Sequence, residues 1–553
     1  MGPHHGQKTV GMYARCRSAL QKTSPSRRRA RRFPLLVVLA VVLFLWTGSE
    51  LHQGSASAMF TVLFGVGLAP QPEPFTDITY GTPQPPGTDR PDWEPGLCSV
   101  PEIEFLRRAQ LGLTSNILYS RRCVNPIRSK ASHARGTVIN IPGPLITSKT
   151  EVNLTKCVDF ELPPCETVSL PVPPVYPRKQ YPHLLFGVAS SYDRLNASLP
   201  EFAHWLASTG AQLLGIVADA NDGGGTRYDL GALQAAYRDR GVQATFIPPT
   251  ITKRINRIAL GEKGDVAAPV EQHHFLLVRE LSAVAQPGTR WLSIIDDDTF
   301  FPSLYPLDQE LARHDHTRPA WLGALSDDFN SVRYWGYQAF GGAGVFLSLP
   351  LASVIASRTE QCLREATTDQ GDGLLRECIS MHSRTTLTLI SGLYQHDLRG
   401  DPSGFFESGV LPLSLHHWKS WYRAPVAAIS RIATHVCGSC LLQRFRFGND
   451  TLLSNGYSVA VYANDTLPSL DLSRVEGTWL HATSDYHPTY GQLRPKLSSD
   501  DKKSYILRDA ILETRPKGKK VFRQLYVYRV GENAWEQATP KGIDEVIELV
   551  WDL

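Results

Sequence analysis

The alternation of short apolar runs with amphipathic stretches between residues 181 and 298 constrains the fold more than any other feature of this sequence. Each apolar run has the length of a buried strand, and each intervening stretch carries apolar residues at helical spacing. Strands that alternate with helices form a parallel sheet with helices on both faces, and ligands bind at the carboxyl ends of its strands. The predicted strands are 184–189, 213–218, 242–247 and 291–295, and the predicted helices are 200–208, 228–240 and 270–284.

Three consecutive carboxylates, Asp296, Asp297 and Asp298, directly follow the last predicted strand. Adjacent carboxylates repel each other, and they are tolerated when water solvates them or when a cation lies between them. Carboxylate oxygens are hard ligands that suit Mg²⁺ or Mn²⁺, and a cation held in this way can bridge to a diphosphate. The alternative is an exposed acidic turn that holds no ligand.

Other chemistries fit the sequence less well. A phosphatase of the haloacid-dehalogenase type needs D-x-D-x-T/V, but Phe300 occupies the last position and Thr299 comes one residue early. The sequence contains no GxxxxGKS/T phosphate loop and no G-x-S-x-G nucleophile turn. The glycine-rich segment 341–344 lacks the GxGxxG pattern, so it indicates either a close approach of backbone to a ligand or a tight turn between strands.

Charge is divided unevenly along the chain. Residues 1–32 hold nine Lys and Arg and no acidic residue, and the other 48 Lys and Arg are outnumbered by 53 Asp and Glu. A slightly acidic folded part argues against a general nucleic-acid binder. An apolar run at 33–49 follows the basic leader and predicts a signal-anchor with the remainder in the lumen. The alternative is a signal peptide cleaved near Ala56-Ser57-Ala58, which would give a secreted protein.

The cysteines and the N-x-S/T sequons agree with a lumenal location. Cys16 precedes the apolar run and eight cysteines follow it, an even number that suits disulfides in an oxidising compartment. We expect pairing between neighbours, 157–165, 362–378 and 437–440, with a redox or zinc pair at Cys437 and Cys440 as the alternative. Four sequons also follow the apolar run, at Asn153, Asn196, Asn449 and Asn464.

Several segments stand in a diagnostic order: RWLSIIDDDTFFP (290–302), FGGAGVFLS (340–348), GDGLLRECI (371–379), GLYQHDLRGDPSGFFES (392–408) and LPLSLHHW (411–418). Together with NGYSVAVY (455–462), they resemble the fringe-like glycosyltransferases of family 31, above all the fungal and plant fringe-related branch. The resemblance covers roughly 181–465, about half of the chain.

This resemblance implies a GT-A fold, in which a Rossmann-like nucleotide-sugar half joins an acceptor half. It implies an inverting, Mn²⁺-dependent hexosyltransferase that moves a hexose or N-acetylhexosamine from a UDP-sugar to a glycan hydroxyl, usually in β1,3 linkage. Carried over residue by residue, Asp298 is the direct metal ligand. Asp296 belongs to the metal site as well and contacts the nucleotide ribose, with Asp297 between them. His416 completes the metal site, and His417 is the alternative.

The catalytic base implied by the resemblance is Asp372. The family has an acidic residue before this aspartate and an apolar residue after it, and both are replaced here by Gly371 and Gly373. The alternatives for the base are Asp369, Glu365 and Asp401. Further contacts with the UDP-sugar donor are expected from Arg194, Asp219, Gly342 and Gly344.

The expected organisation is that of a Golgi type II membrane protein whose partners are a UDP-sugar and a glycan or glycoprotein acceptor, with no nucleic acid. The altered base motif leaves open a second function, a catalytically silent lumenal sugar-binding or scaffold protein on the same fold. The expected regions are a cytosolic tail (1–32), a signal-anchor (33–49), a Pro-rich stem (50–96), a disulfide-tied extension (97–180), the GT-A catalytic domain (181–430) and a β-rich C-terminal region (431–553).

Overall fold

The computed structural model divides the chain into two compact units, Met1–Pro86 and Gly87–Leu553, and every described residue belongs to the second unit. Among the described residues, no helix is long and apolar enough to cross a membrane. The predicted signal-anchor and stem lie outside the described residues, as do Cys16, Cys98 and Cys157. The described residues are 103–129, 134–155, 162–220, 228–258, 261, 264–480, 482, 485–530 and 542–553.

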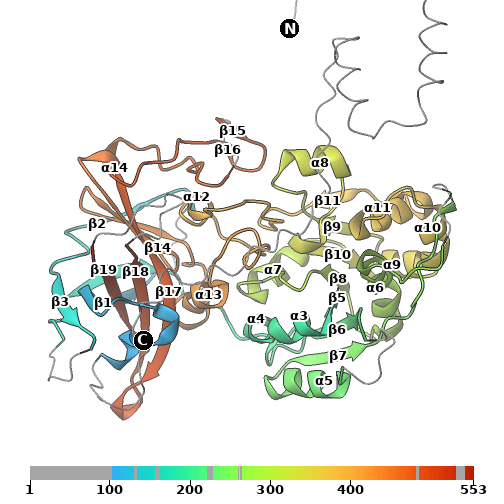
Figure 1. Ribbon diagram of the computed structural model, residues 1–553, viewed down its shortest axis with the longest axis horizontal. Helices are drawn as coiled ribbons and strands as arrows, with labels where there is room; N and C mark the ends of the chain where they lie inside the picture. The colour runs from blue at the N-terminus through green and yellow to red at the C-terminus, as the bar shows by residue number, and fades with distance from the viewer. Residues whose placement is uncertain are drawn as a thin grey trace, which may run out of the picture. The chain divides into compact units, whose positions relative to one another are not determined.

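A seven-stranded mixed sheet forms the α/β half, in the order β11-β9-β10-β8-β5-β6-β7 (Figure 1). The four predicted strands are confirmed as β5, β6, β7 and β8, and they are mutually parallel. The strand β10 runs antiparallel to both β8 and β9. The strands are β5 (Leu184–Ser190), β6 (Gln212–Val217), β7 (Gln243–Ile247), β8 (Trp291–Ile295), β9 (Trp321–Gly323), β10 (Val345–Ser348) and β11 (Leu387–Leu389).

Helices cover both faces of this sheet, because successive side chains of a strand point to opposite faces. Leu185 belongs to the core under α6, whereas Phe186 and Val188 belong to the core on the other face. The first face carries α6 (Val270–Val284), α9 (Leu349–Ala356), α10 (Thr359–Glu365) and α11 (Gly371–His382). The second carries α3 (Tyr192–Ala197), α4 (Leu199–Leu206), α5 (Leu230–Asp239) and α7 (Leu304–Leu311). The three predicted helices are confirmed as α4, α5 and α6.

A ten-stranded sheet unites the two regions that flank the α/β half in sequence. The N-terminal strand β1 pairs in parallel with the C-terminal strand β19, from Ile117 opposite Asp544 to Val124 opposite Trp551. The strands are β1 (Asn116–Arg128), β2 (Ile139–Ile141), β3 (Thr150–Asn153), β4 (Thr167–Val172), β12 (Arg444–Phe447), β13 (Thr451–Ser454), β14 (Ser458–Tyr462), β17 (Lys502–Thr514), β18 (Lys520–Tyr528) and β19 (Asp544–Asp552).

One of the hydrophobic cores extends across both sheets. The helix α13 (Val426–His435) contacts both β17 of the ten-stranded sheet and α4 of the α/β half. Phe522 and Trp551 of the C-terminal region belong to the same buried cluster as Phe186 and Phe202. The C-terminal region is therefore packed onto the α/β half. Short elements complete the fold: α8 (Phe329–Trp335), α12 (Ser403–Phe406), α14 (Thr466–Ser469), and the strands β15 (Tyr486–His487) and β16 (Gly491–Gln492) of a small hairpin.

Disulfides join Cys123 to Cys165, Cys362 to Cys378, and Cys437 to Cys440. The last two pairings were expected. The expected pairing of 157 with 165 is wrong, because Cys165 lies two residues before β4, and β4 is the neighbour of β1 in the sheet. Strand pairing places Cys123 opposite Thr167, so Cys165 reaches Cys123 across 42 residues of chain.

Candidate functional site

The aspartate triplet lies at the carboxyl edge of the α/β sheet, immediately after β8. All five residues of β8 are buried, so the chain first meets polar surroundings at Asp296. Because β10 is antiparallel to β8, the glycine-rich segment before β10 reaches the same edge, with Val345 opposite Ile294. The Thr299 hydroxyl links the two segments by donating to the carbonyl oxygen of Gly342 at 3.0 Å.

A backbone bridge brings His416 to the triplet. Phe300 and Leu415 exchange two N–H···O bonds of 2.8 Å, which fixes residues 411–418 beside the turn after β8. The Trp418 indole N–H then donates to the carbonyl oxygen of Asp298 at 2.6 Å. These hydrogen bonds therefore bring segments that are far apart in the sequence together beside the aspartate triplet.

His416 contacts two of the three carboxylates. Its Nε2 lies 2.9 Å from Oδ1 of Asp298 and 3.3 Å from Oδ2 of Asp296. Its Nδ1 lies 3.0 Å from the carbonyl oxygen of Gln395, and a carbonyl only accepts, so Nδ1 carries a proton. This bond directs Nε2 toward the carboxylates. A Cβ at Gly342 would come within 2.2 Å of the ring of His416, so only glycine leaves room for it.

The donor set of this cluster fits a divalent cation. Burial alone would lower the pKa of His416, but the charge of Asp298 and hydrogen bonds to both carboxylates raise it well above its usual value. Burial alone would raise the pKa of Asp298, but the neighbouring imidazole lowers it below its usual range. Carboxylate oxygens with an imidazole nitrogen suit Mn²⁺, and the Nδ1–H bond to a backbone carbonyl is the support that metal-binding histidines have.

His417, the alternative ligand, also lies close but is engaged elsewhere. One ligand atom each from Asp298, His416 and His417 lie within 4.8 Å of one another. The Nε2 of His417, however, lies 3.0 Å from Oδ1 of Asp397, and its ring stacks on Trp421 at 4.2 Å. The geometry therefore favours His416 over His417 as the imidazole ligand.

Asp297 points away from the other two carboxylates into a network of its own. Arg194 donates to it through Nε (2.5 Å) and Nη2 (2.6 Å), the Ser190 hydroxyl donates to Oδ2, and Lys419 lies 3.6 Å away. This paired carboxylate joins β8 to the start of α3. The hydrogen bonds that Arg194 donates to Asp297 raise the pKa of Arg194 despite partial burial. This guanidinium, which was predicted to contact the nucleotide-sugar donor, is therefore already paired on one side.

Asp219 and Gly344 also have local structural partners. Asp219 follows β6 and accepts a hydrogen bond of 2.9 Å from the backbone N–H of Tyr192, at the start of α3. Gly344 has a φ of 93°, a conformation that favours glycine, just before β10. Both residues lie at the carboxyl edge of the sheet. Their contacts with the nucleotide-sugar donor stay predictions.

Asp372 joins the site from the first turn of α11. Its Oδ2 accepts a hydrogen bond of 2.9 Å from the backbone N–H of Gly341, while its Oδ1 is buried without a hydrogen-bond partner among the described residues. Burial raises the pKa of Asp372 to about 6, since the nearby His274 offsets only part of that effect. A carboxylate with one free oxygen and a pKa near neutrality has the properties of a general base.

The three alternatives for the base lie outside this cluster. Asp369 is exposed and lies 3.9 Å from Arg257. Glu365 is exposed and accepts a hydrogen bond from Gln361 on the same helix. Asp401 accepts from the backbone of Ser403 and pairs with Lys496 at 3.5 Å. Among the described residues, none of the three contacts the aspartate triplet.

His274 is a member of the site that sequence reasoning missed. Its Nε2 lies 3.3 Å from Oδ1 of Asp296, and its ring lies between two glycines. A Cβ at Gly341 would come within 2.8 Å of Nε2, and one at Gly371 within 2.7 Å of Nδ1. The glycine before Asp372 therefore makes room for this imidazole. The unusual Gly371 was the only signal in the sequence, and it does not say which side chain fills the space.

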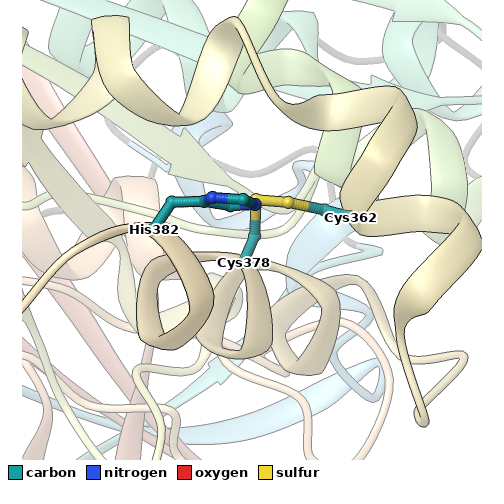
Figure 2. Close-up of side chains that lie close together, drawn as sticks. All are labelled: Cys362, Cys378 and His382. Atoms are coloured by element: carbon teal, nitrogen blue, oxygen red, sulfur yellow. A yellow bond between two sulfur atoms is a disulfide. The ribbon is translucent and has the colours of Figure 1, made fainter.

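A second group of possible metal ligands is not a metal site in this state. Cys362, Cys378 and His382 come together on α10 and α11, as Figure 2 shows. The two cysteines are joined in a disulfide, so neither offers a thiolate. A cavity of about 560 Å³, lined in part by Tyr176, Lys179 and Tyr305, contains none of the expected site residues.

Comparison with known proteins gives one family match. The model of the family described as "Protein of unknown function, DUF604" matches residues 331–431, a span that includes Asp372 and His416 but not the aspartate triplet. No curated protein matches the sequence.

The fold has low similarity to several solved structures. Mouse xyloside xylosyltransferase 1 in its apo form is 10% identical with a TM-score of 0.24, over 38% of this chain and 84% of that one. The galactosyltransferase LgtC in complex with donor and acceptor sugar analogues is 13% identical with a TM-score of 0.29, over 46% and 95%. The 4-diphosphocytidyl-2C-methyl-D-erythritol synthase of Anaerococcus prevotii is 10% identical with a TM-score of 0.22, over 38% and 89%.

Proposed function

We propose that this chain is a metal-dependent glycosyltransferase that moves a sugar from a nucleotide diphosphate donor to a hydroxyl of a glycan. The observation that carries the proposal is the meeting of two kinds of group at one edge of the α/β sheet. Asp298 and His416 offer a cation site, and Asp372 offers a buried carboxylate with one free oxygen. A diphosphate leaving group needs the first, and a hydroxyl nucleophile needs the second.

The finer assignment rests on the sequence resemblance to fringe-like enzymes of family 31. In this assignment the donor is a UDP-sugar and the metal is Mn²⁺. The enzyme transfers a hexose or N-acetylhexosamine with inversion at the anomeric carbon and forms a β1,3 linkage. The basic leader with its apolar run supports a type II protein of the Golgi membrane, whose catalytic part lies in the lumen. Three disulfides within the described residues support an oxidising compartment.

The chain's own residues divide the chemistry between them. The Gly341 N–H holds one oxygen of Asp372, so the other is free to take the proton of the acceptor hydroxyl. As that proton leaves, the hydroxyl oxygen bonds to the anomeric carbon while the bond from that carbon to the diphosphate oxygen breaks. One displacement inverts the anomeric centre, so a single base suffices. When bound by Asp298, Asp296 and His416, Mn²⁺ would offset the negative charge on the departing diphosphate.

The test is the release of UDP by the full-length protein. The purified chain is incubated with Mn²⁺ and, in turn, UDP-galactose, UDP-glucose, UDP-N-acetylglucosamine and UDP-N-acetylgalactosamine, with and without EDTA. We expect at least one donor to be hydrolysed, and we expect Asp298→Ala and EDTA each to abolish the release. Asp315→Ala, which removes an exposed carboxylate that caps the turn to Thr317, is the matched control and should leave the rate unchanged.

A different outcome would support the second function. If no donor is turned over while the protein still binds glycans, the chain is a silent sugar-binding or scaffold protein on this fold. The raised pKa and free oxygen of Asp372 favour the enzyme, because the departure from the family motif at Gly371 leaves the carboxylate in the site.

A further inference from the structure

Exposed aromatic side chains gather in two segments of the molecule. Among the described residues, four Phe, Tyr or Trp side chains are exposed: Phe329 (59%), Tyr334 (65%), Tyr337 (56%) and Tyr486 (63%). Three belong to α8 and the two residues after it, and the fourth belongs to the β15–β16 hairpin. We call these four residues the aromatic platform. Clustered exposed apolar side chains, unlike scattered ones, are typical of binding surfaces.

The two segments that carry the platform touch each other. The Tyr490 hydroxyl of the hairpin donates to Oδ1 of Asp327 at 3.1 Å, and Asp327 lies two residues before Phe329. His487, next to Tyr486, hydrogen-bonds to the backbone of Asp327 and stacks on Tyr490 at 4.6 Å. Figure 1 shows α8 and the hairpin along the same edge of the molecule. The platform therefore spans a junction between the α/β half and the C-terminal region.

The C-terminal end of α8 is attached to the helix that carries the candidate base. Arg376 of α11 donates from Nη1 to the carbonyl oxygen of Trp335 at 2.6 Å. Arg376 follows Asp372 by four residues, so the two share one face of α11 about 6 Å apart along its axis. The chain then runs from Tyr337 to Gly341, whose N–H holds Asp372. The end of α8 is thus tied to the helix that carries Asp372, and the chain after Tyr337 leads to the backbone N–H that donates to Asp372.

The other end of α8 is attached near the candidate metal ligands. Asp397 accepts a hydrogen bond from the Ser326 hydroxyl, just before α8, and lies 3.0 Å from Nε2 of His417. His417 is the neighbour of His416. The segment around α8 is therefore held at one end by Asp397, which contacts His417, and at the other by Arg376 of the helix that carries Asp372. None of the residues of α8 itself is buried.

We propose that the aromatic platform binds the acceptor glycan, an inference that rests on the proposed function. A pyranose ring presents C–H groups on its faces and hydroxyls around its rim, so it needs flat apolar surfaces with polar groups beside them. The platform supplies four rings, and Asn330, Arg333 and Asp328 lie among them on the same segment. Val332, the one aliphatic residue of α8, is half-buried, so the exposed apolar surface of this helix is aromatic.

The inference predicts that the C-terminal hairpin helps to choose the acceptor. Tyr486 comes from the region beyond 465, where the sequence resemblance ends, and it joins α8 at the site. Part of the proposed acceptor-binding surface thus comes from a region of the sequence outside the α/β half.

The test is glycan binding by the full-length protein, measured by surface plasmon resonance on neoglycoproteins that carry lactose, N,N′-diacetylchitobiose or mannobiose. We expect the wild type to bind at least one of them, and Tyr334→Ala and Tyr337→Ala each to weaken that binding at least tenfold. Tyr337→Phe keeps the ring and should restore most of the binding. Leu389→Ala, which shortens an exposed apolar side chain on β11, is the matched control and should bind like the wild type.

Three outcomes would overturn the inference: no binding by the wild type, unchanged binding by both alanine variants, or lower thermal midpoints that account for their loss of binding. A wild type that sediments as a dimer, with alanine variants that sediment as monomers, would also overturn it, because the platform would then join two copies. UDP release by the wild type without any glycan reports separately on the proposed function.

Discussion

Nε2 of His274 lies 3.3 Å from Oδ1 of Asp296, while Nε2 of His416 lies 3.3 Å from the other oxygen of the same carboxylate. Two imidazoles from distant parts of the sequence thus hold Asp296 between them. Burial alone would raise the pKa of Asp296, but its hydrogen bonds to His274 and His416 lower it well below its usual range. The carboxylate is therefore ionised and oriented.

His274→Ala should lower the rate of UDP release about 10- to 100-fold, the usual effect of losing a residue that orients a ligand. His274→Gln, which keeps a hydrogen-bond donor, should recover part of the rate. The apparent affinity for Mn²⁺, measured from the rate against metal concentration, should weaken in the alanine variant. His314→Ala removes a half-buried imidazole near Glu310 and serves as control. An unchanged metal affinity in His274→Ala would contradict the orienting role.

Asp372→Asn should abolish the transfer to an acceptor, with a loss of about 10²- to 10⁴-fold, because an amide cannot take a proton. In the wild type, kcat/KM should fall as the pH drops through about 6, since burial raises the pKa of Asp372 to about 6 and only the deprotonated form acts as base. The measurement is the pH profile of transfer. A profile that keeps its acidic limb in Asp372→Asn would assign that limb to another group.

Gly371→Ala should destabilise the protein by about 1–3 kcal/mol, the usual cost of overpacking. Alanine is the better helix former, so a loss of stability would come from the added Cβ, which would lie 2.7 Å from Nδ1 of His274. The cost should shrink when Gly371→Ala is combined with His274→Ala, as urea unfolding of the single and double variants would show. Gly136→Ala, where a Cβ would meet nothing within 4 Å, should be neutral.

Asp327→Asn should stabilise the protein above pH 7 but not below about pH 4. Burial, helped by the charge of Asp397, raises the pKa of Asp327 to about 7, although bonds from the His396 N–H, Tyr490 and Thr489 oppose the rise. Between these pH values the folded state binds the proton more tightly, so the free energy of unfolding of the wild type falls as pH rises.

Asparagine has no proton to lose, so the variant should lack this fall. The gain at pH 8 should reach up to about 4 kcal/mol, because one pKa unit corresponds to about 1.4 kcal/mol. Chemical unfolding at pH 4, 6 and 8 measures it. Equal slopes of stability against pH in both proteins would show that Asp327 keeps an ordinary pKa.

The sequence by itself determined the local parts of this protein. Alternating apolar runs gave β5, β6, β7 and β8 within a few residues, because strand length and helical periodicity are local properties. The position of Asp296–Asp298 after a buried strand, and the ordered motifs through His416, led to the same edge of the sheet that the structure shows. The disulfides between close neighbours, 362–378 and 437–440, were also predicted from the sequence and are confirmed.

Only the tertiary structure decided which distant residues meet. His274 reaches Asp296 because α6 packs over the sheet beside two glycines, and nothing near His274 in sequence indicates that contact. Cys165 pairs with Cys123 because β1 and β4 are neighbours in a sheet. The same physics joins β1 to β19 and brings the hairpin with Tyr490 against Asp327. Backbone pairing and side-chain packing between remote segments depend on the whole fold, so no local pattern records them.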